Sequence, residues 1–495
     1  MQAYAVESGQ DPFEGLRTLF ARAVDWLSGS GSAGLAHGDL EAQVAVRFRD
    51  LARQAVQDHL DLRAENEVLL AEVVDADGVA RGRAEVGRQR GLATIFGQVT
   101  VDRVAYRERG CPDLHPADAV LNLPIEKHSH GLRRLAAVEA ARGSFAQAVD
   151  AIGRAAGTRV GKRQVEALTV RAALDVDAFY AQRRPDPAGD EVVLGMSADA
   201  KGVVMRSEAL RESTAKARTS QKLSTRLSAG EKRNRKRMAE VVSVFDSVPG
   251  ARTPNDILPA PGQDVRPGPV TSGKWLSASV TREAAEVIAA MFDEAARRDP
   301  EYRRTWICLL DGNAHQIERV TAEANARGVT VTIIIDFIHV LEYLWGAAWC
   351  LHTKGDPTAE AWVRHQAHQI LSGHVGQVIT DLATHPTGPT DDGHAGIDRA
   401  VRYLTNQQPY LDYLTALASG WPIATGIIEG ACRHLVKDRL DITGARWGLE
   451  SAEAVLKLRA LITNGDLDDY WTYHINQEHQ RVHKARYAES VIPEP

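Results

Sequence analysis

With 495 residues, 44% of them hydrophobic and 25% charged, the chain has the composition of an average globular protein of roughly two to four domains. It has no apolar run of 18 residues and no basic and then apolar segment at its start, so we expect a cytoplasmic protein without a transmembrane helix. The net charge of −6 argues against nucleic-acid binding, but it is an average over the whole chain, and local charge matters more. Four scattered cysteines without a Cys-x-x-Cys pair argue against a zinc ribbon or a disulfide framework.

Helices and a hairpin are predicted in the first part of the chain. Apolar residues recur at helical spacing over residues 12–28 and 39–61, which predicts an N-terminal helical region within residues 1–80. The β-branched and aromatic run 92–106, with Gly97 near its middle, predicts a β-hairpin. Its partner could be protein or DNA.

A helix-turn-helix candidate follows the hairpin, and together they form a region, 81–185, that we expect to bind DNA. Ser144 can cap a helix whose apolar residues recur at i, i+3, i+4 and i+7, and Gly157 would end it. The second helix would open with polar residues in the place where a recognition helix contacts bases or phosphates, namely Lys162, Arg163 and Gln164. Two helices of an ordinary bundle would explain the same pattern.

Residues 186–336 have the pattern of a mixed α/β domain. The predicted elements are strands at 192–198, 203–206 and 239–245, a helix over 281–298, a strand ending at Asp311, a helix after Asn313 and a strand over 329–335. Three adjacent strands, then alternating helix and strand, is the RNase H-like order. The Pro- and Gly-rich stretch 249–273 is expected to be a surface loop.

This core is predicted to be discontinuous in sequence, because the stretch between Asp311 and Glu429 is much longer than one helix and one strand require. We expect a helical insertion domain at 337–424, the last part of the core at 425–465 and a C-terminal tail at 466–495. The predicted fold class is therefore α/β and α, multidomain. An RNase H-like mixed-sheet catalytic core is interrupted by a helical insertion and preceded by helical and helix-turn-helix-like regions.

Three carboxylates are the candidate catalytic and metal-binding residues. Asp199 and Asp311 each end an apolar run, and Glu429 lies just ahead of a helical, cationic stretch. Breaking or joining a phosphodiester requires charge stabilisation on the attacking and the leaving oxygen, which two divalent ions roughly 4 Å apart supply. Mg²⁺ prefers such hard oxygen ligands. Asp336 and His339 could hydrogen-bond at a strand-to-helix junction, which would orient the histidine; turn, cap and structural roles remain the alternatives for all five residues.

Basic residues lie near these carboxylates in the sequence. Between Arg206 and Glu240 there are eleven Lys or Arg against four Glu, and we expect the densest part of this stretch to contact phosphates: Lys232, Arg233, Arg235, Lys236 and Arg237. Arg433 and Lys437 follow Glu429 at i+4 and i+8, so on an α-helix they would share its face and reach phosphates beside the metal ions. A solvated surface would explain the same charges.

Several motifs in combination resemble the ISKra-type insertion-sequence transposases of bacteria. The motifs are Ser197-Ala198-Asp199-Ala200-Lys201-Gly202, Leu310-Asp311-Gly312-Asn313, Asp336-Phe337-Ile338-His339-Val340-Leu341-Glu342-Tyr343-Leu344-Trp345, Gly426-Ile427-Ile428-Glu429-Gly430, Thr443-Gly444-Ala445-Arg446-Trp447 and Leu458-Arg459-Ala460-Leu461. The resemblance covers residues 90–475.

The resemblance implies a DDE transposase that binds the terminal inverted repeats of its element and cuts and joins DNA strands. The three carboxylates would be its catalytic triad and would hold two Mg²⁺ ions, with Mn²⁺ as an alternative, while Asp336 and His339 resemble the D-x-x-H element of related transposases. Arg446 and Trp447 join the expected DNA contacts. The expected partners are terminal-repeat DNA, target DNA and further copies of the chain in a homodimer or larger assembly, without a membrane.

Two other functions remain open at this point. An RNase H-like nuclease would cut DNA without joining it. A regulator derived from a transposase would bind DNA without metal-dependent cutting, and the intact triad argues against it. In each case we expect a bacterial protein of the cytoplasm, associated with the nucleoid when it is bound to DNA.

Overall fold

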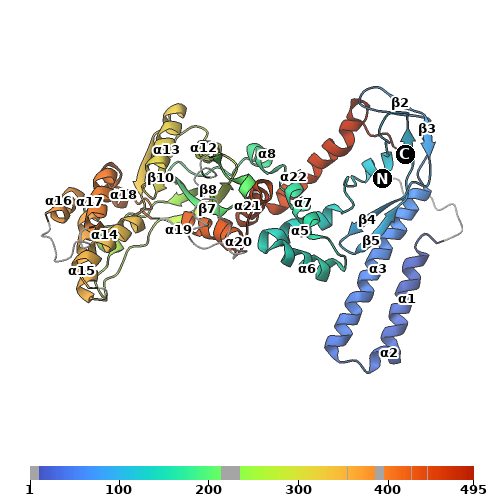
Figure 1. Cartoon of the computed structure of the whole chain (residues 1–495), viewed down its shortest axis with the longest axis horizontal. Helices are drawn as coiled ribbons and strands as arrows, with labels where there is room; N and C mark the ends of the chain where they lie inside the picture. The colour runs from blue at the N-terminus through green and yellow to red at the C-terminus, as the bar shows by residue number, and fades with distance from the viewer. Residues whose placement is uncertain are drawn as a thin grey trace. The chain divides into compact units, whose positions relative to one another are not determined.

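The computed structural model describes residues 11–212, 214, 235–353, 355–384, 395–424, 426–442 and 444–494. The chain divides into two compact units, one formed by residues 1–181 with 466–495 and the other by residues 182–465 (Figure 1). None of the helices in the described parts combines the length and the apolar character needed to cross a membrane.

The first unit begins with a helical hairpin. Its helices are α1 (Glu14–Ser28), α2 (Ser30–Ala33) and α3 (His37–Glu65), and Figure 1 shows α1 and α3 side by side with α2 at their connection. The hairpin is held by the Asp58 carboxylate, which accepts a hydrogen bond from the Leu16 backbone N–H (2.8 Å), and by the Arg47 guanidinium, which lies 3.7 Å from the centre of the Trp26 ring. The helices predicted at 12–28 and 39–61 are confirmed.

Short antiparallel strands follow the hairpin. They pair as β1 with β2, β3 with β6, and β4 with β5, with the bounds β1 (Val73–Val74), β2 (Ala80–Arg81), β3 (Arg83–Glu85), β4 (Arg90–Thr94), β5 (Gly97–Val101) and β6 (Ala105–Arg107). The predicted hairpin is confirmed as β4 and β5, but it ends at Val101 rather than at residue 106. Gly97 has a φ of +128°, which a residue with a side chain rarely adopts, at the turn between the two strands.

Three helices pack around one apolar core in the region predicted as helix-turn-helix. They are α5 (His130–Arg142), α6 (Phe145–Ala156) and α7 (Lys162–Ala172), preceded by α4 (Pro116–Val120) and followed by α8 (Val176–Gln182). Ser144 caps α6 in a reciprocal pair with Gln147, and Gly157 ends it in the left-handed conformation, both as predicted. Ile152 and Val165 are fully buried in the shared core.

Residues 466–495, expected as a C-terminal tail, contain a helix and belong to the same compact unit as residues 1–181. The helix α22 (Leu467–Glu478) continues into a π-helical turn, His479–His483. Short 3₁₀ turns follow at Lys484–Arg486 and Ala488–Ser490. His474 and Glu478 are buried, and charged partners compensate them: Asp175 bonds the His474 ring (2.7 Å) and Arg133 donates to Glu478 (2.7 Å).

The second unit is built on a five-stranded mixed sheet in the order β11-β10-β7-β8-β9. The strands are β7 (Val193–Val204), β8 (Lys236–Val248), β9 (Val270–Ser279), β10 (Trp306–Leu310) and β11 (Val331–Ile335). β7 pairs in parallel with β10, and β10 in parallel with β11, while β8 is antiparallel to both β7 and β9. All five residues of β10 are buried, as expected for a central strand.

Two strand predictions in this sheet were wrong. Residues 192–198 and 203–206 were expected as separate strands, but they belong to the single strand β7, because every residue from Val193 to Val204 pairs with the long strand β8. The stretch 249–273 was expected to be a loop, but β9 begins within it at Val270. The first residues of β9 are exposed, so they lack the apolar signal of a buried strand.

Helices cover both faces of the sheet (Figure 1). On one face α12 (Ala284–Arg298) places the Phe292 ring 6.1 Å from the ring of Trp306, which pairs with Leu194. The helix α13 (Ala314–Arg327) connects β10 to β11 and packs beside α12. On the opposite face lie α19 (Gly426–Ala431) and a π-helical segment (Cys432–Lys437). The helices α20 (Asp438–Leu440) and α21 (Leu449–Asn464) follow them in the chain.

The described residues between β11 and α19 are mostly helical, as expected for the predicted insertion, 337–424. Their helices are α14 (Phe337–Leu351), α15 (Pro357–Leu371), α16 (Val375–Ala383), α17 (Ala395–Gln407) and α18 (Tyr413–Ala418), with a 3₁₀ turn at Gln408–Tyr410. Among its described residues, this unit also has short helices at Ser207–Ala209 and at α11 (Pro254–Ile257). The helices α14 and α17 pack along each other.

Candidate functional site

Asp199 and Asp311 lie next to each other where the parallel pairing between β7 and β10 ends. Ser197 of β7 and Leu309 of β10 are the last paired residues of these strands. Asp199 follows Ser197 by two residues, and Asp311 follows Leu309 by two residues. Because neighbouring strands are about 4.8 Å apart, equal offsets past the same pair place the two backbones next to each other. The two residues are therefore neighbours where this ladder ends, with Asp311 directly after β10 and Asp199 within β7 rather than at the strand end that the sequence suggested.

The Asp199 carboxylate is held by groups from two elements. The Ala200 backbone N–H donates to its Oδ1 (2.6 Å), and the Cys432 thiol donates to its Oδ2 (3.1 Å). Burial raises the pKa of the Cys432 thiol, and the Asp199 charge raises it further, so the thiol keeps its proton and acts as a donor. This contact joins β7 to the π-helical segment across the sheet face.

Glu429 lies on the helix that this contact brings to the sheet. It precedes Cys432 by three residues, one helical turn, and its side chain is exposed on α19, which packs against β7 and β8. The structure thus brings the helix of Glu429 to Asp199. Within the described chain, however, no three His, Cys, Asp or Glu side chains lie close enough to hold a metal ion.

The backbone turn that carries Asp311 is held from outside its strand at three successive carbonyls. The Asp336 N–H donates to the Leu310 carbonyl (2.8 Å). The Tyr403 hydroxyl donates to the Asp311 carbonyl (2.8 Å), and the Gln407 Nε2 donates to the Gly312 carbonyl (2.9 Å). The two side-chain donors are one turn apart on α17, so a helix of the insertion fixes the backbone beside a candidate catalytic residue.

The Tyr403 side chain is itself rigidly placed. Its ring stacks on Tyr343 of α14 with a centroid distance of 3.7 Å and an interplanar angle of 13°. Burial raises the pKa of the Tyr403 hydroxyl, and Tyr343 and the charge of Asp311 raise it further, so the hydroxyl remains a donor. Gly312 has a φ of +92°, and a Cβ there would meet the Tyr403 ring at 2.9 Å. The turn therefore requires glycine.

Asp336 and His339 occupy the start of α14, at the predicted strand-to-helix junction. The Asp336 side chain caps this helix by accepting a hydrogen bond from the Ile338 N–H (2.8 Å). The His339 Nδ1 lies 3.3 Å from the Glu342 carboxylate, one turn further along the helix. These contacts give both residues structural partners.

Glu240 is a carboxylate near the site that the sequence did not single out. It lies on β8 opposite Ala200, and burial raises its pKa, as does the charge of Asp199. Side chains alternate along a strand, so Glu240 points to the other face of the sheet from Asp199, which pairs with Val241. Glu240 therefore interacts with the charge of Asp199 but is not a third ligand beside Asp199 and Asp311. The available signal was a charged residue directly before the apolar run Val241-Val242.

The predicted basic residues after Glu429 lie on a helical segment of a different type from the one expected. Arg433 and Lys437 are both exposed, although the segment is π-helical rather than α-helical, so the i+4 and i+8 spacing no longer describes its turns. The Arg459 Nε donates to the carbonyls of His434 (2.8 Å) and Leu435 (3.1 Å), which belong to this wider helix.

Arg446 and Trp447 lie on the connection to α21. Arg446 is partly exposed, whereas Trp447 is buried and its indole N–H donates to the Leu440 carbonyl (2.9 Å). The Trp447 backbone also bonds Arg206 and Val204 at the end of β7. Contact of this tryptophan with DNA would require it to leave the core.

The dense basic run is only partly within the described residues. Lys232 and Arg233 lie outside them, whereas Arg235 directly precedes β8 and the exposed Lys236 begins it. Arg237 donates from its Nε to the Val280 carbonyl (2.6 Å), and burial lowers its pKa. Its guanidinium is therefore occupied by the protein backbone.

The residues predicted to open the second helix of the helix-turn-helix do so. Lys162, Arg163 and Gln164 are exposed in the first turn of α7. Gln164 accepts a hydrogen bond from the Gly161 N–H (3.0 Å), which leaves the two cations free of that capping contact. Cations at this end of a helix add to its positive pole, which favours an anionic partner.

Comparison of the sequence with models of known protein families gives no match, and comparison with curated protein sequences gives no significant match.

Proposed function

We propose that this chain is a DDE transposase with an RNase H-like catalytic core, which binds the terminal inverted repeats of an insertion sequence and cleaves and joins DNA. The observation that carries the proposal is the placement of Asp199 and Asp311 at equal offsets past the last paired residues, Ser197 and Leu309, with the helix of Glu429 joined to Asp199 through Cys432. The strand order β11-β10-β7-β8-β9, with only β8 reversed, supports the RNase H-like assignment.

The donor set fits Mg²⁺, because all three candidate ligands are carboxylates and Mg²⁺ prefers hard oxygen ligands. Two such ions, with Mn²⁺ as a substitute, would supply charge stabilisation at the attacking and leaving oxygens. Asp199 and Asp311 would be the fixed ligands, since Asp199 lies within β7 and Asp311 lies on the turn after β10 that α17 holds. Glu429 would be the adjustable one, since its side chain is exposed on a short helix and can swing toward the sheet.

The remaining residues would place the DNA. The exposed Arg433 and Lys437, next to Glu429 in the chain, would bind phosphates beside the reacting bond, and α7 would enter a groove of the terminal repeat with Lys162 and Arg163. No side chain needs to serve as nucleophile, because water attacks first and the released 3′-hydroxyl attacks target DNA. We propose that the enzyme acts as a homodimer or larger assembly in the bacterial cytoplasm.

The test is cleavage of labelled DNA that carries the ends of the element, with Mg²⁺ or with EDTA. We expect metal-dependent nicking at the end by the wild type and a loss of about a hundred- to a thousandfold, the range found when one stabilising group of a catalytic site is removed, in Asp199→Asn, Asp311→Asn and Glu429→Gln. DNA binding should survive. The matched control is Asp356→Asn, a partly exposed helix cap in the same unit where asparagine caps equally well.

Two outcomes would replace the proposal. Nicking without joined product from precut ends would indicate a nuclease that lacks strand transfer. Binding of the ends by folded protein without any metal-dependent nicking would indicate a transposase-derived regulator.

A further inference from the structure

The helical hairpin formed by α1 and α3 carries an apolar face that the described residues of its own chain leave exposed. Phe20 is 53% exposed and Phe48 is 44% exposed, and Val24 and Leu27 are exposed beside them. Within α1 only Ala23 is buried. We refer to Phe20, Val24, Leu27 and Phe48 as the hairpin face.

Two stripes of apolar residues run along α1, and α3 covers only one of them. Leu19, Ala23 and Trp26 lie at i, i+4 and i+7, and these residues are buried or half-buried. Phe20, Val24 and Leu27 repeat the same spacing one residue later and are exposed. A helix that is apolar on two sides is typical of one that packs on two sides.

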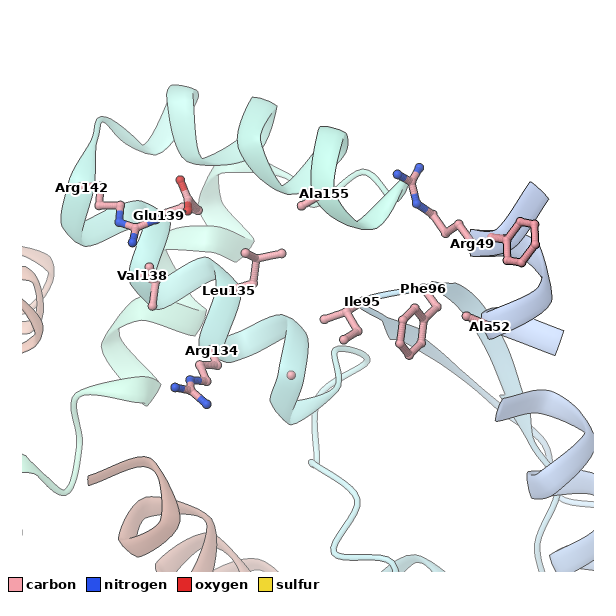
Figure 2. A pocket seen from close by; sticks show the side chains of 12 residues that line it. Arg49, Ala52, Ile95, Phe96, Arg134, Leu135, Val138, Glu139, Arg142 and Ala155 are labelled. Atoms are coloured by element: carbon pink, nitrogen blue, oxygen red, sulfur yellow. Dashed lines mark hydrogen bonds and ion pairs between the residues drawn. The ribbon is translucent and has the colours of Figure 1, made fainter. Parts of the chain in front are cut away.

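The hairpin face continues into two grooves that share Phe48 and Ala52. One groove, with a volume of about 460 Å³, lies between α1 and α3 and is lined by Leu16 and Phe20. The other, about 640 Å³, lies between α3, the β4–β5 turn and α5, where Figure 2 shows Ile95, Phe96 and Leu135 around it. The apolar surface is thus continuous over several elements, which marks an interaction site.

The charges around this face argue against DNA or an anionic membrane as its partner. From Glu14 to Asp50 the hairpin carries four arginines and five acidic residues, so both signs are present and they nearly cancel: Arg17, Arg22, Arg47 and Arg49, against Glu14, Asp25, Asp39, Glu41 and Asp50. A polyanionic partner selects an excess of cations. A balanced border suits another protein surface of the same kind.

We propose that the hairpin face binds the same face of a second copy of this chain, so that two hairpins form a four-helix bundle around a two-fold axis. In a two-fold interface each patch must be complementary to itself. If the two α1 helices cross antiparallel with the axis between Ala23 and Val24, then Phe20 of each copy meets Leu27 of the other, because these residues are equally far from the axis. Two helical hairpins packed in this way are an established route to a stable bundle.

The dimensions of the hairpin face approach those of a stable contact. The 15 residues of α1 span about 22 Å, and two adjacent helices are roughly 20 Å wide. Such a face projects roughly 440 Å² on each copy, and its protruding side chains add accessible area toward the roughly 600 Å² per partner at which specific interfaces begin. The inference does not depend on catalysis and holds whether or not the chain is a transposase.

The first test measures the mass of the full-length protein in solution by light scattering at micromolar concentration. One copy has a mass of 54.0 kDa, and we expect twice that mass for the wild type. Phe20→Glu combined with Leu27→Glu should give the single-copy mass. Val46→Glu is the matched control, because Val46 is 54% exposed on the same hairpin but lies two residues before Phe48, roughly 200° around α3. It should keep the wild-type mass.

The second test keeps the proposal falsifiable if the double variant fails to fold. Val24→Cys places a thiol beside the proposed axis, where it meets its own counterpart, and mild oxidation should give a covalent dimer well above the wild-type background of the four native cysteines. Val46→Cys should remain at that background. A wild type of single-copy mass, a dimer that survives the double substitution, or equal cross-linking at both positions would overturn the proposal.

Discussion

The Tyr403 hydroxyl donates a 2.8 Å hydrogen bond to the backbone carbonyl of Asp311, which joins two residues 92 positions apart in the chain. Together with the bond from Gln407 to the Gly312 carbonyl, it ties α17 to the turn that orients a candidate metal ligand. The helices between β11 and α19 are therefore part of the support of the site. Groups that orient a ligand in this way typically change metal affinity or activity by 10–100-fold when they are removed.

Tyr403→Phe should loosen the Asp311 turn while the ring remains stacked on Tyr343. We expect metal-dependent nicking to fall about 10-fold and the Mg²⁺ concentration for half-maximal nicking to rise, because the ligand is less well oriented. Binding of end DNA should be unchanged. Tyr343→Phe is the control, since it keeps the stack and leaves the Tyr403 hydroxyl in place. Wild-type nicking by Tyr403→Phe would show that the turn does not need this bond.

Gly312→Ala should cost more stability than Gly328→Ala in the same unit. Both glycines have positive φ, +92° and +66°, so each substitution costs roughly 1 kcal/mol from the left-handed backbone alone. Nothing lies within 4 Å of a Cβ at Gly328, whereas a Cβ at Gly312 would meet the Tyr403 ring at 2.9 Å, which adds about 1–3 kcal/mol of overpacking. Urea unfolding of the two variants measures the difference. Equal losses would mean that the contact with α17 relaxes freely.

Lys162→Ala combined with Arg163→Ala should weaken binding of end DNA and lower its salt dependence. Each phosphate contact contributes roughly 0.9 to the slope of log affinity against log salt, so loss of two contacts should reduce the slope by about two. Titrations between 50 and 200 mM salt, the order of magnitude at which such slopes are measured, give this value. Arg83→Ala with Arg109→Ala removes two exposed cations from the same unit. If both pairs have the same effect, α7 is not a specific contact.

The sheet could be predicted where burial leaves a continuous apolar pattern. β10 and β11 are such runs, and each ends at the residue before an aspartate, as the sequence indicated. β9 was missed because its first residues are exposed, and β7 was divided in two because Asp199-Ala200-Lys201-Gly202 has the composition of a turn. In the folded chain, pairing with β8 overrides that local preference.

The position of Asp311 directly after its strand could be predicted, but the place of Asp199 inside β7 and the groups that support both residues could not. Asp199 and Cys432 are 233 residues apart, and only the packing of the π-helical segment against β7 brings the thiol to the carboxylate. The contact between Tyr403 and Asp311 likewise depends on how α17 meets the end of β10. Such contacts follow from tertiary packing and leave no periodic signal in the sequence. For Trp447 the motif could be recognised in the sequence, but the burial of its side chain could not be predicted.

Acid should destabilise the first unit through Glu478, the buried carboxylate of α22. Burial alone would raise its pKa, but hydrogen bonds from Arg481, Arg171 and Arg133 outweigh burial and lower the pKa from its ordinary value of 4.5 to about 2. Because the folded pKa is the lower one, this stabilisation is fully present above pH 4.5 and is lost as the pH falls toward 2. The shift corresponds to roughly 3 kcal/mol.

Glu478→Gln should therefore lower the urea midpoint at neutral pH and flatten its decline between about pH 4.5 and 3, because glutamine has no charge to lose. Far-UV circular dichroism at several pH values follows this transition. The control is Glu108→Gln, an exposed carboxylate in the same unit. If Glu478→Gln loses stability with acid as steeply as the wild type does, other carboxylates cause the acid sensitivity. If Glu478→Gln has the same urea midpoint as the wild type at neutral pH, other groups compensate the positive charges of Arg133, Arg171 and Arg481.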